Sequence, residues 1–381
     1  MTSQPYLATW FSKNKNLILA NLVLMLLPLA VVTLFIPSKT AKPQSNQLPV
    51  IIGNPQLYPV YIHRRGWGFI NANGAKVIPP TLEEVTPFSE GLAGVKMNGK
   101  WGYINETGTL VIQPRFDAAG EFHNGLAKVV FDEIKRFGVL IPRPPIAFIN
   151  RHGEKVIDCL QFQSVNGFQE GLAAVQIDNK WGFINLQGQV VIQPEFEIAY
   201  DFSEGLSLVF KDGKYGFITP SGDWQIPPQL ISASSFHNGR AKILVIAQDE
   251  AESYGFCDRQ GKLVIPAEFE DASNFSEGLA AVRKNGKWGF IDAEGKVVVP
   301  FQFQTADSFS SGRAAVFLGN GVTPDAKYGY IDSTGNVVIP ARFGKAEPFR
   351  GELASVKIAF EPKELSYVNR DGKIIWRTIL R

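Results

Sequence analysis

The sequence is poor in the residues from which most metal and redox sites are built. Among its 381 residues there are only two cysteines and four histidines. The cysteines, Cys159 and Cys257, lie far apart, whereas zinc and redox motifs require closely spaced groups. We therefore expect both to be small, buried, apolar side chains. A disulfide between them is the alternative.

The signatures of common catalytic sites are also missing. The sequence contains no G-x-S-x-G, P-loop or H-E-x-x-H pattern. His123 and His237 occupy matching F-H-N-G segments that are distant in the chain, where each replaces a serine in a predicted turn. We expect no catalytic residue, no metal ligand and no cofactor, and we predict that the protein is not an enzyme.

A strong excess of one charge is absent as well. The formal net charge is +2, and acidic and basic residues are interspersed along the chain. Proteins that bind nucleic acid generally carry a basic stripe or patch, because contacts to phosphate dominate their affinity. The sequence therefore predicts no nucleic-acid partner.

One long apolar run lies near the N-terminus. The segment Leu17–Ile36 reads LILANLVLMLLPLAVVTLFI and has no charge, which is about the length that crosses a bilayer as a helix. We predict a transmembrane helix or signal anchor at residues 17–36, after a short tail of residues 1–16. A cleaved signal peptide is the alternative, but no small-x-small cleavage site follows Ile36.

The anchor is followed by a segment that is typical of a linker. Residues 37–49, PSKTAKPQSNQLP, are polar and contain proline. We expect this linker to hold the remaining chain, residues 50–381, off the membrane. The lysines on the two sides of the apolar run are balanced, so orientation is weakly specified. We predict a single-pass membrane protein whose large domain is extracytoplasmic.

An internal repeat dominates the rest of the chain. The clear copies recur about every 34 residues or slightly more, and their W-G or Y-G pairs begin at Trp67, Trp101, Trp181, Tyr215, Tyr254, Trp288 and Tyr328. Two further copies are degenerate, at Ile146–Asn150 and Leu365–Asn369, so nine copies are predicted in all.

The clearest copy, Phe275–Phe303, predicts a three-stranded antiparallel meander. The apolar segment LAAV leads to Asn285-Gly286, which suits a type I′ hairpin turn with positive φ at both residues. W-G-F-I is the return strand, and Asp292–Gly295 is the next turn, in which the aspartate side chain caps the backbone. V-V-V forms a third strand, which we expect to end at Pro300.

The aromatic residues of the copy predict its interior. Trp288 and Phe290 share one face, because side chains alternate along a strand. Gly289 leaves bare backbone where a neighbouring aromatic side chain can pack. We expect the periodic tryptophans to lie in the core, so that Trp288→Ala destabilises the array by about 3 kcal/mol. Their use as exposed platforms for sugars is the alternative.

The fold class that follows is all-β. A single meander cannot bury its aromatic face, so neighbouring repeats must stack into a continuous core. We predict an open, superhelical, solenoid-like array, with Ile374–Trp376 capping its C-terminal end. A closed, propeller-like ring is the alternative, although nine three-stranded units differ from the usual four to eight four-stranded blades.

The repeat resembles a known family. Its W-G-[FY]-I-[DN]-x-x-G core, with F-S-E-G-L-A upstream, is similar to the WG-containing repeat of bacterial proteins. The resemblance covers about residues 60–376; the third and ninth copies depart from it by lacking W-G. It implies a repeated β fold, and it implies neither a shared catalytic activity nor a particular ligand.

Carboxylates recur in the segment F-[SQ]-E-G. Paired carboxylates perform glycoside hydrolysis, but residues at one repeat position spread along the array and do not converge on one site. We therefore interpret them as turn residues, and likewise the Asp or Asn of the second turn. The recurring glutamates are Glu90, Glu170, Glu204 and Glu277.

Four insertions fall at one place in the repeat, between the first strand and the W-G strand. Loops that enlarge one repeat position emerge from one edge of the array, and such an edge is often a binding surface. The first insertion, FDEIKRFGVLIPRP, carries the candidate binding residues Arg136, Phe137 and Arg143. Neutral variation of surface loops is the alternative. The insertions are Phe131–Pro144, Ala247–Ser253, Gly319–Lys327 and Ala359–Glu364.

These features together predict a function of binding. We expect a membrane-anchored scaffold or binding module that presents its repeat surface to a protein or an envelope polymer. The alternative is a carbohydrate-binding or cell-wall-binding protein that uses exposed aromatic residues.

Overall fold

The computed structural model describes residues 56–131, 145–247, 251–318, 327–358 and 365–378. The chain divides into the units Met1–Ile52 and Gly53–Arg381, and all described residues belong to the second. The predicted membrane segment and its linker lie outside the described residues. Within the described ranges, no helix has the length and apolar character needed to span a bilayer.

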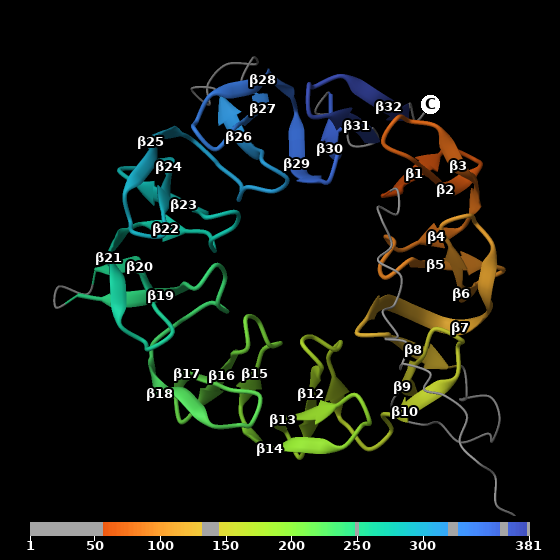
Figure 1. Ribbon diagram of the computed structural model, residues 1–381, viewed down its shortest axis with the longest axis horizontal. Coiled ribbons are helices and arrows are strands. Elements are labelled where there is room, and N and C mark those ends of the chain that lie inside the picture. The colour runs from red at the N-terminus through yellow and green to blue at the C-terminus, as the bar shows by residue number, and fades with distance from the viewer. Residues whose placement is uncertain (1–55, 132–144, 248–250, 319–326, 359–364, 379–381) are drawn as a thin grey trace, which may run out of the picture. The chain divides into compact units, whose positions relative to one another are not determined.

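The described residues form antiparallel β-sheets and no α-helix (Figure 1). The first sheet contains β1 (Tyr58–Ile62), β2 (Gly66–Ile70) and β3 (Lys76–Leu82). The second contains β4 (Glu84–Val85), β5 (Leu92–Met97), β6 (Lys100–Asn105), β7 (Leu110–His123), β8 (Leu126–Phe131), β9 (Ile146–Ile149) and β10 (Lys155–Asp158).

The next three sheets follow in chain order. They contain β11 (Ser164–Val165), β12 (Leu172–Ile177), β13 (Lys180–Asn185) and β14 (Val190–Phe196); then β15 (Ile198–Ala199), β16 (Ser207–Lys211), β17 (Lys214–Ile218) and β18 (Trp224–Leu230); then β19 (Ala241–Ile246), β20 (Glu252–Cys257) and β21 (Leu263–Phe269).

The last three sheets complete the unit. They contain β22 (Asp271–Ala272), β23 (Leu279–Lys284), β24 (Lys287–Asp292) and β25 (Val297–Phe303); then β26 (Ala314–Leu318), β27 (Lys327–Ile331) and β28 (Val337–Phe343); then β29 (Lys345–Arg350), β30 (Leu353–Lys357), β31 (Leu365–Asn369) and β32 (Ile374–Thr378).

The described part of the chain holds nine repeats in eight sheets. The seven-stranded sheet contains two repeats, because the long strand β7 ends one meander and begins the next. Several repeats also begin with a strand of two residues, such as β22, which pairs with β23. The prediction of nine meanders is confirmed, and the meanders have three or four strands.

The two local turns of the repeat form as predicted. Asn285 and Gly286 both have positive φ, at 51° and 72°, as a type I′ hairpin requires. The Asp292 carboxylate accepts hydrogen bonds from the amides of Glu294 and Lys296, at 3.1 and 2.8 Å. Because these bonds form within a few residues of each other, the sequence specifies the turns directly.

The glycine of the W-G pair is required by the third strand of its own sheet. Trp288 pairs with Phe303 and Phe290 pairs with Val299, so β25 bulges by two residues opposite Gly289. A Cβ atom at this glycine would lie 2.7 Å from the Val299 carbonyl oxygen. The expected aromatic neighbour exists, since the Phe301 ring would lie at 3.0 Å, but the backbone contact is the tighter one.

The same bulge corrects the predicted end of the third strand. Pro300 lies inside β25, at the bulge, where the ladder does not need its missing amide. The strand therefore continues to Phe303. At the other W-G and Y-G glycines an added Cβ would likewise lie 2.4–2.7 Å from a third-strand carbonyl oxygen: Gly68, Gly102, Gly182, Gly216, Gly255 and Gly329.

The two degenerate repeats lack both this glycine and the two-residue bulge opposite it. Ala147 and Ser366 stand where the other repeats have this glycine. Their third strands pair with them residue opposite residue, Ala147 with Asp158 and Ser366 with Arg377. The two-residue bulge is thus associated with glycine, because a side chain at this position would meet the bulged backbone.

The fully buried aromatic residue is the one that follows the W-G pair. Phe290 has 0% exposed surface, whereas Trp288 is half-buried at the border of the same apolar cluster. The prediction that the tryptophans are core residues is therefore only partly confirmed. The residue that directly follows the aromatic–glycine pair contributes more to the interior than the tryptophan does.

Pairs of aromatic rings join each repeat to the next. The ring of Phe290 packs against Phe309 of the following repeat, with centroids 4.9 Å apart and tilted planes. We call these pairs the aromatic rungs. The others, with centroids 4.7–5.0 Å apart, are Phe69–Phe88, Tyr103–Phe122, Phe148–Phe168, Phe183–Phe202, Phe217–Phe236, Phe256–Phe275 and Tyr330–Phe349.

The first and the last repeat are in contact, so the unit Gly53–Arg381 forms a ring. Tyr58, Val60 and Ile70 share one apolar cluster with Leu353 and Tyr367. Figure 1 shows β32 returning beside β1. The predicted open array is therefore wrong, and the alternative, a closed ring, is observed.

Closure has a simple geometric cause. The second-turn glycine of one repeat faces a third-strand side chain of the repeat before it, as Gly295 faces Ile265. Each such interface adds a similar rotation. Gly74 of the first repeat faces the backbone and side chain of Ile375, in the third strand of the last repeat. The strand that carries Ile375 therefore forms this interface and is not a solvent-facing cap.

Candidate functional site

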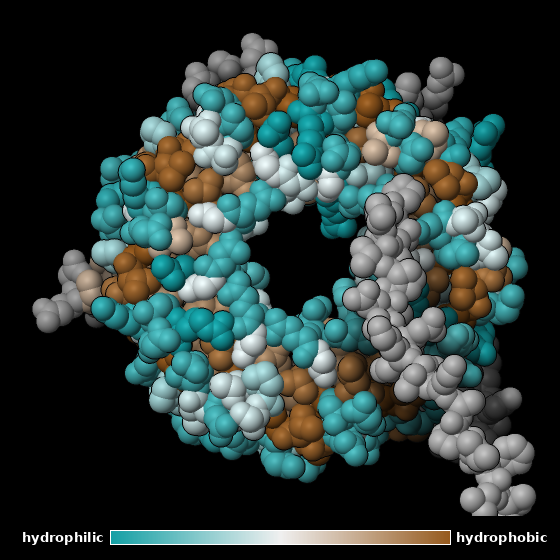
Figure 2. Space-filling view, in the orientation of Figure 1, coloured by the Kyte–Doolittle hydropathy of each residue, from teal (hydrophilic) through white to brown (hydrophobic). Residues whose placement is uncertain are grey.

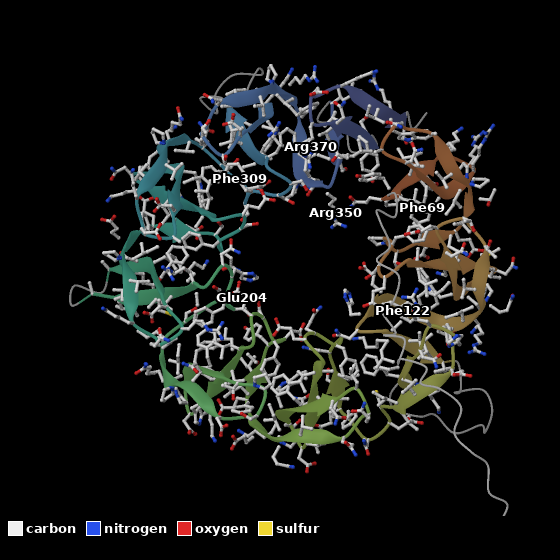
Figure 3. All side chains as sticks on the ribbon, in the orientation of Figure 1. Phe69, Phe122, Glu204, Phe309, Arg350 and Arg370 are labelled. Carbon is white, nitrogen blue, oxygen red and sulfur yellow. The ribbon has the colours of Figure 1, made fainter. Side chains whose placement is uncertain are left out.

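The recurring glutamates lie in turns at the inner edge of the ring. Each has a positive φ, 54° for Glu204 and 51–54° for Glu90, Glu170 and Glu277. Figure 3 shows Glu204 and Arg350 facing the central opening from different repeats. Hydrophilic residues line most of the visible inner edge in Figure 2. The inner edge is the most polar recurrent feature and is the first candidate site.

The glutamate side chains bond to the backbone of the next repeat. The Glu170 carboxylate accepts hydrogen bonds from the amides of Glu204 and Gly205, at 2.7 and 2.8 Å. The Glu204 carboxylate accepts them from Asn238 and Gly239, at 2.5 and 2.9 Å. Amides in a turn with positive φ point outward together, so one carboxylate can satisfy two of them.

The pattern continues with other acceptors around the ring. We call Glu90, Asn124, Glu170, Glu204, Asn238, Glu277 and Ser311 the turn belt. The remaining bonds run from the Gly125 amide to Glu90, Gly171 to Asn124, Gly278 to Asn238, Gly312 to Glu277 and Gly351 to Ser311, at 2.8–3.2 Å.

A second set of bonds accompanies the belt. The Ser203 hydroxyl donates to the carbonyl oxygen of Phe236, at 2.7 Å, and so fixes the next rung residue. Three other hydroxyls do the same at 2.6–2.7 Å: Ser89 to Phe122, Ser276 to Phe309 and Ser310 to Phe349. The segment F-S-E-G thus carries one ring and two polar groups that join neighbouring repeats.

The turn belt shows how the recurring glutamates are used in the fold. The turn role predicted for the glutamates is confirmed. Sequence reasoning missed the inter-repeat bonds, because their partners lie a whole repeat away. The recurrence of F-S-E-G at a fixed distance was the signal that could have revealed them. The geometry is that of a structural connection between neighbouring repeats.

Replacing Glu204 with alanine is expected to destabilise the ring by about 1–2 kcal/mol, because two backbone amides lose a charged acceptor. Urea unfolding followed by circular dichroism measures the change. The exposed Glu294 offers a matched control, and Glu294→Ala is expected to change stability by less than about 0.5 kcal/mol. Equal effects of the two substitutions would contradict the structural role of the belt.

A comparison with protein-family models identifies the repeat. The model described as the WG containing repeat matches eight times, and the matches span more than half of the chain. The chain belongs to the WG-containing repeat family. The matched segments are residues 67–101, 101–133, 147–181, 181–215, 215–245, 254–288, 288–321 and 328–359.

No curated protein matches the sequence. Among solved structures, two similar ones are extracellular domains assigned to hybrid two-component systems of B. thetaiotaomicron. BT3049 has 9% identity and a TM-score of 0.24 over 85% of this chain and 50% of that one. BT4673 has 10% identity and a TM-score of 0.31 over 84% of this chain and 55% of that one. The chain thus spans about half the length of these two domains.

A third similar structure is apo AztD from Citrobacter koseri. It has 12% identity and a TM-score of 0.30, over 77% of this chain and 80% of that one. Scores this low describe a loose likeness of shape, and we draw no function from them.

The described histidines and cysteines lie at separate places in the fold. His237 lies in a first turn, where its amide donates to the Arg240 carbonyl oxygen at 2.9 Å. Cys159 and Cys257 are both buried and free, as the sequence predicted. Burial raises the pKa of Cys159 to about 12 and that of Cys257 to about 11, so neither is a ready thiolate.

The side chains that could bind a metal ion are also dispersed among the described residues. Across the described ranges, no three His, Cys, Asp or Glu side chains gather as metal ligands would. The repeats place equivalent acids one interface apart around the ring, which separates them.

The strands that flank the four insertions occupy the same position in their repeats. The described strands that flank them are β8 and β9, β19 and β20, β26 and β27, and β30 and β31. Each pair is the hairpin between the first long strand and the strand of the aromatic–glycine pair, or its degenerate equivalent in β9 and β31. The predicted single position of the insertions is thus confirmed by their flanking strands. The candidate residues Arg136, Phe137 and Arg143 lie outside the described residues.

The WG-repeat tryptophans offer a different surface. Trp67, Trp101, Trp181 and Trp288 are all half-buried, with the covered part against an apolar cluster. Part of each ring therefore faces solvent. This exposure keeps sugar stacking as the alternative to a purely structural role.

Proposed function

We propose that this protein is a membrane-anchored, non-catalytic binding module. Its ring of WG repeats serves as a rigid scaffold, and its insertion-bearing end contacts a protein or an envelope polymer. Residues 17–36 anchor the chain, and the ring lies outside the cytoplasm. The observation that carries the proposal is the contrast between the two ends of the repeats.

Strand direction defines these two ends. In the seventh repeat, β23 runs from the first turn to the hairpin at Asn285, and β24 returns to the second turn at Asp292. Both turns therefore lie at one end of the sheet, and the hairpin lies at the other. The turn end is occupied by bonds between repeats, such as those of Glu204.

The hairpin end varies between repeats. Some repeats have a short turn, such as Asn285-Gly286, and others carry insertions at the same place. A closed ring supports such loops without a cost to its own packing, because they follow strands that are already paired. Variation on a constant scaffold is the arrangement expected of a recognition surface.

Cross-linking of the full-length protein in its native membranes tests the proposal. We expect removal of residues 132–144 to reduce the recovered partner at least tenfold, because binding energy concentrates in a few interface residues. Arg151→Ala with His152→Ala, two exposed residues at the turn end of the same repeat, is the matched control and should retain the partner. Equal recovery from both variants would refute recognition at the hairpin end.

The anchor is tested separately. We expect the full-length protein to stay in membranes washed at alkaline pH, and a variant without residues 17–36 to be released. Protease added outside the intact cell membrane should digest the ring of the full-length protein. Release of the full-length protein by the wash, or complete protection of the ring, would contradict this part of the proposal.

Carbohydrate binding remains the second candidate, because the tryptophan rings are partly exposed. Stacking of a sugar on an exposed indole changes its fluorescence. Titration with purified cell-wall polysaccharide therefore distinguishes the two candidates. A saturable change that is lost in Trp288→Phe would favour carbohydrate over a protein partner.

A further inference from the structure

The contact between the first and ninth repeats differs from every other interface of the ring. We call it the seam. It joins β1 and β2 to β30, β31 and β32, which lie at opposite ends of the chain. The other interfaces join repeats that follow each other in sequence, so the chain itself connects them. The seam is held by non-covalent contacts alone.

The aromatic packing at the seam is looser. Tyr58 and Tyr367 have ring centroids 5.8 Å apart, compared with 4.7–5.0 Å at the aromatic rungs. Tyr367 occupies the rung position of the ninth repeat. Tyr58 comes from β1, the first long strand of its repeat, whereas the corresponding rung residues of the other repeats precede that strand, so Tyr58 approaches its partner differently.

The turn belt also stops before the seam. The Gly351 amide donates the last bond of the belt, to the Ser311 hydroxyl oxygen, but a glycine has no side chain with which to continue the series. In its place, the hydroxyl of Tyr58 donates to the Arg350 carbonyl oxygen at 2.9 Å and accepts from the Glu352 amide at 3.0 Å. The Tyr58 hydroxyl thus accepts a hydrogen bond from a backbone amide, as a belt carboxylate does elsewhere, and donates to a backbone carbonyl oxygen, as a serine hydroxyl does elsewhere.

Two further hydroxyls complete the seam. Tyr367 donates to the Pro59 carbonyl oxygen at 2.9 Å, and Thr378 donates to that of Tyr61 at 2.8 Å. Burial raises the pKa of Tyr367 to about 12, so its hydroxyl remains a donor at any physiological pH. Neutral hydrogen bonds such as these are weaker than the charge-assisted bonds that the glutamates of the belt accept.

We propose that the seam is a reversible clasp at which the ring opens, while the other interfaces stay closed. Three neutral hydroxyls, one loose ring pair, the apolar cluster around Val60 and Ile70, and the Lys76 ammonium over the Trp376 ring hold the clasp. In repeat proteins the terminal units have one covalent neighbour each, and local opening begins where the fewest contacts must be lost. Opening converts the ring into the linear array that its sequence first suggests.

Opening has a defined structural consequence. It uncovers the apolar cluster of Val60, Ile70 and Leu353, which is buried in the closed ring. Both faces of the seam then become available as repeat surfaces that lack a neighbour. The clasp is thereby the one interface at which the ring opens and closes, and this opening does not depend on the loops at the hairpin end.

Hydrogen exchange of the full-length protein, read by mass spectrometry, tests the clasp. We expect the amides of β1 and β31 to exchange at least tenfold faster than those of β13 and β24. Tyr367→Phe should accelerate β1 and β31 about fivefold further, because it removes one bond of the seam. The same substitution should leave β13 and β24 unchanged.

A matched control comes from an internal interface. Tyr103 occupies the same repeat position, and its hydroxyl donates to the Gly120 carbonyl oxygen at 2.8 Å. Tyr103→Phe is expected to leave the exchange of β1 and β31 unchanged. Thr378→Val is a second seam variant and should act as Tyr367→Phe does. Protection of β1 and β31 equal to that of β13, or seam exchange that ignores both seam variants, would overturn the proposal.

Discussion

Alanine in place of Gly289 is expected to destabilise the protein by about 1–3 kcal/mol, although it adds only one methyl group. The added Cβ would lie 2.7 Å from the Val299 carbonyl oxygen and 3.0 Å from the ring of Phe301. The carbonyl belongs to a paired strand and cannot move without loss of the bulge. Urea unfolding followed by circular dichroism measures the loss.

Gly167 provides the matched control for this substitution. It lies outside regular strands, has no positive φ, and would meet no atom within 4 Å if it carried a Cβ. Gly167→Ala is therefore expected to be neutral or slightly stabilising, because alanine restricts the unfolded chain. If Gly289→Ala were as stable as Gly167→Ala, the explanation of the W-G glycine by the bulged strand would be wrong.

The substitution Phe290→Ala is expected to have the largest effect, a loss of about 3–5 kcal/mol. Phe290 is fully buried and contacts Phe309 of the next repeat, so its removal leaves a cavity at an interface and not only within one sheet. Trp288→Ala should cost less than Phe290→Ala, since its ring is half-buried. Thermal unfolding of both variants gives the order.

The reverse order of these two variants would show that the tryptophan, and not the following phenylalanine, is the main interior residue. Val298→Ala serves as the surface control, because this side chain is exposed on the outer strand of the same repeat. It is expected to change stability by less than about 0.5 kcal/mol.

The elements that sequence predicted best are those whose partners lie within a few residues. The hairpin at Asn285-Gly286 and the turn capped by Asp292 follow from local backbone chemistry. The strands follow from the repeat and its alternating apolar residues. The burial of the cysteines follows from the absence of any second group with which they could form a site.

The features that sequence reasoning missed depend on contacts between repeats or between strands. The role of Gly289 depends on how the third strand bulges, and the bonds of Glu204 depend on a turn one repeat later. Ring closure depends on a small rotation summed over nine interfaces, which no single repeat specifies. The roles of Arg136, Phe137 and Arg143 stay a prediction, because these residues lie outside the described ranges.

The central structural claim is that each repeat is joined to the next by a buried pair of rings. A double-mutant cycle on Phe290 and Phe309, with unfolding free energies for the wild type, both single alanine variants and the double variant, tests it most directly. Phe290 with Phe202, which packs in a different rung, is the reference pair and should be additive. We predict a coupling of about 0.5–1.5 kcal/mol between Phe290 and Phe309. Additive losses for Phe290 and Phe309 would contradict the claim.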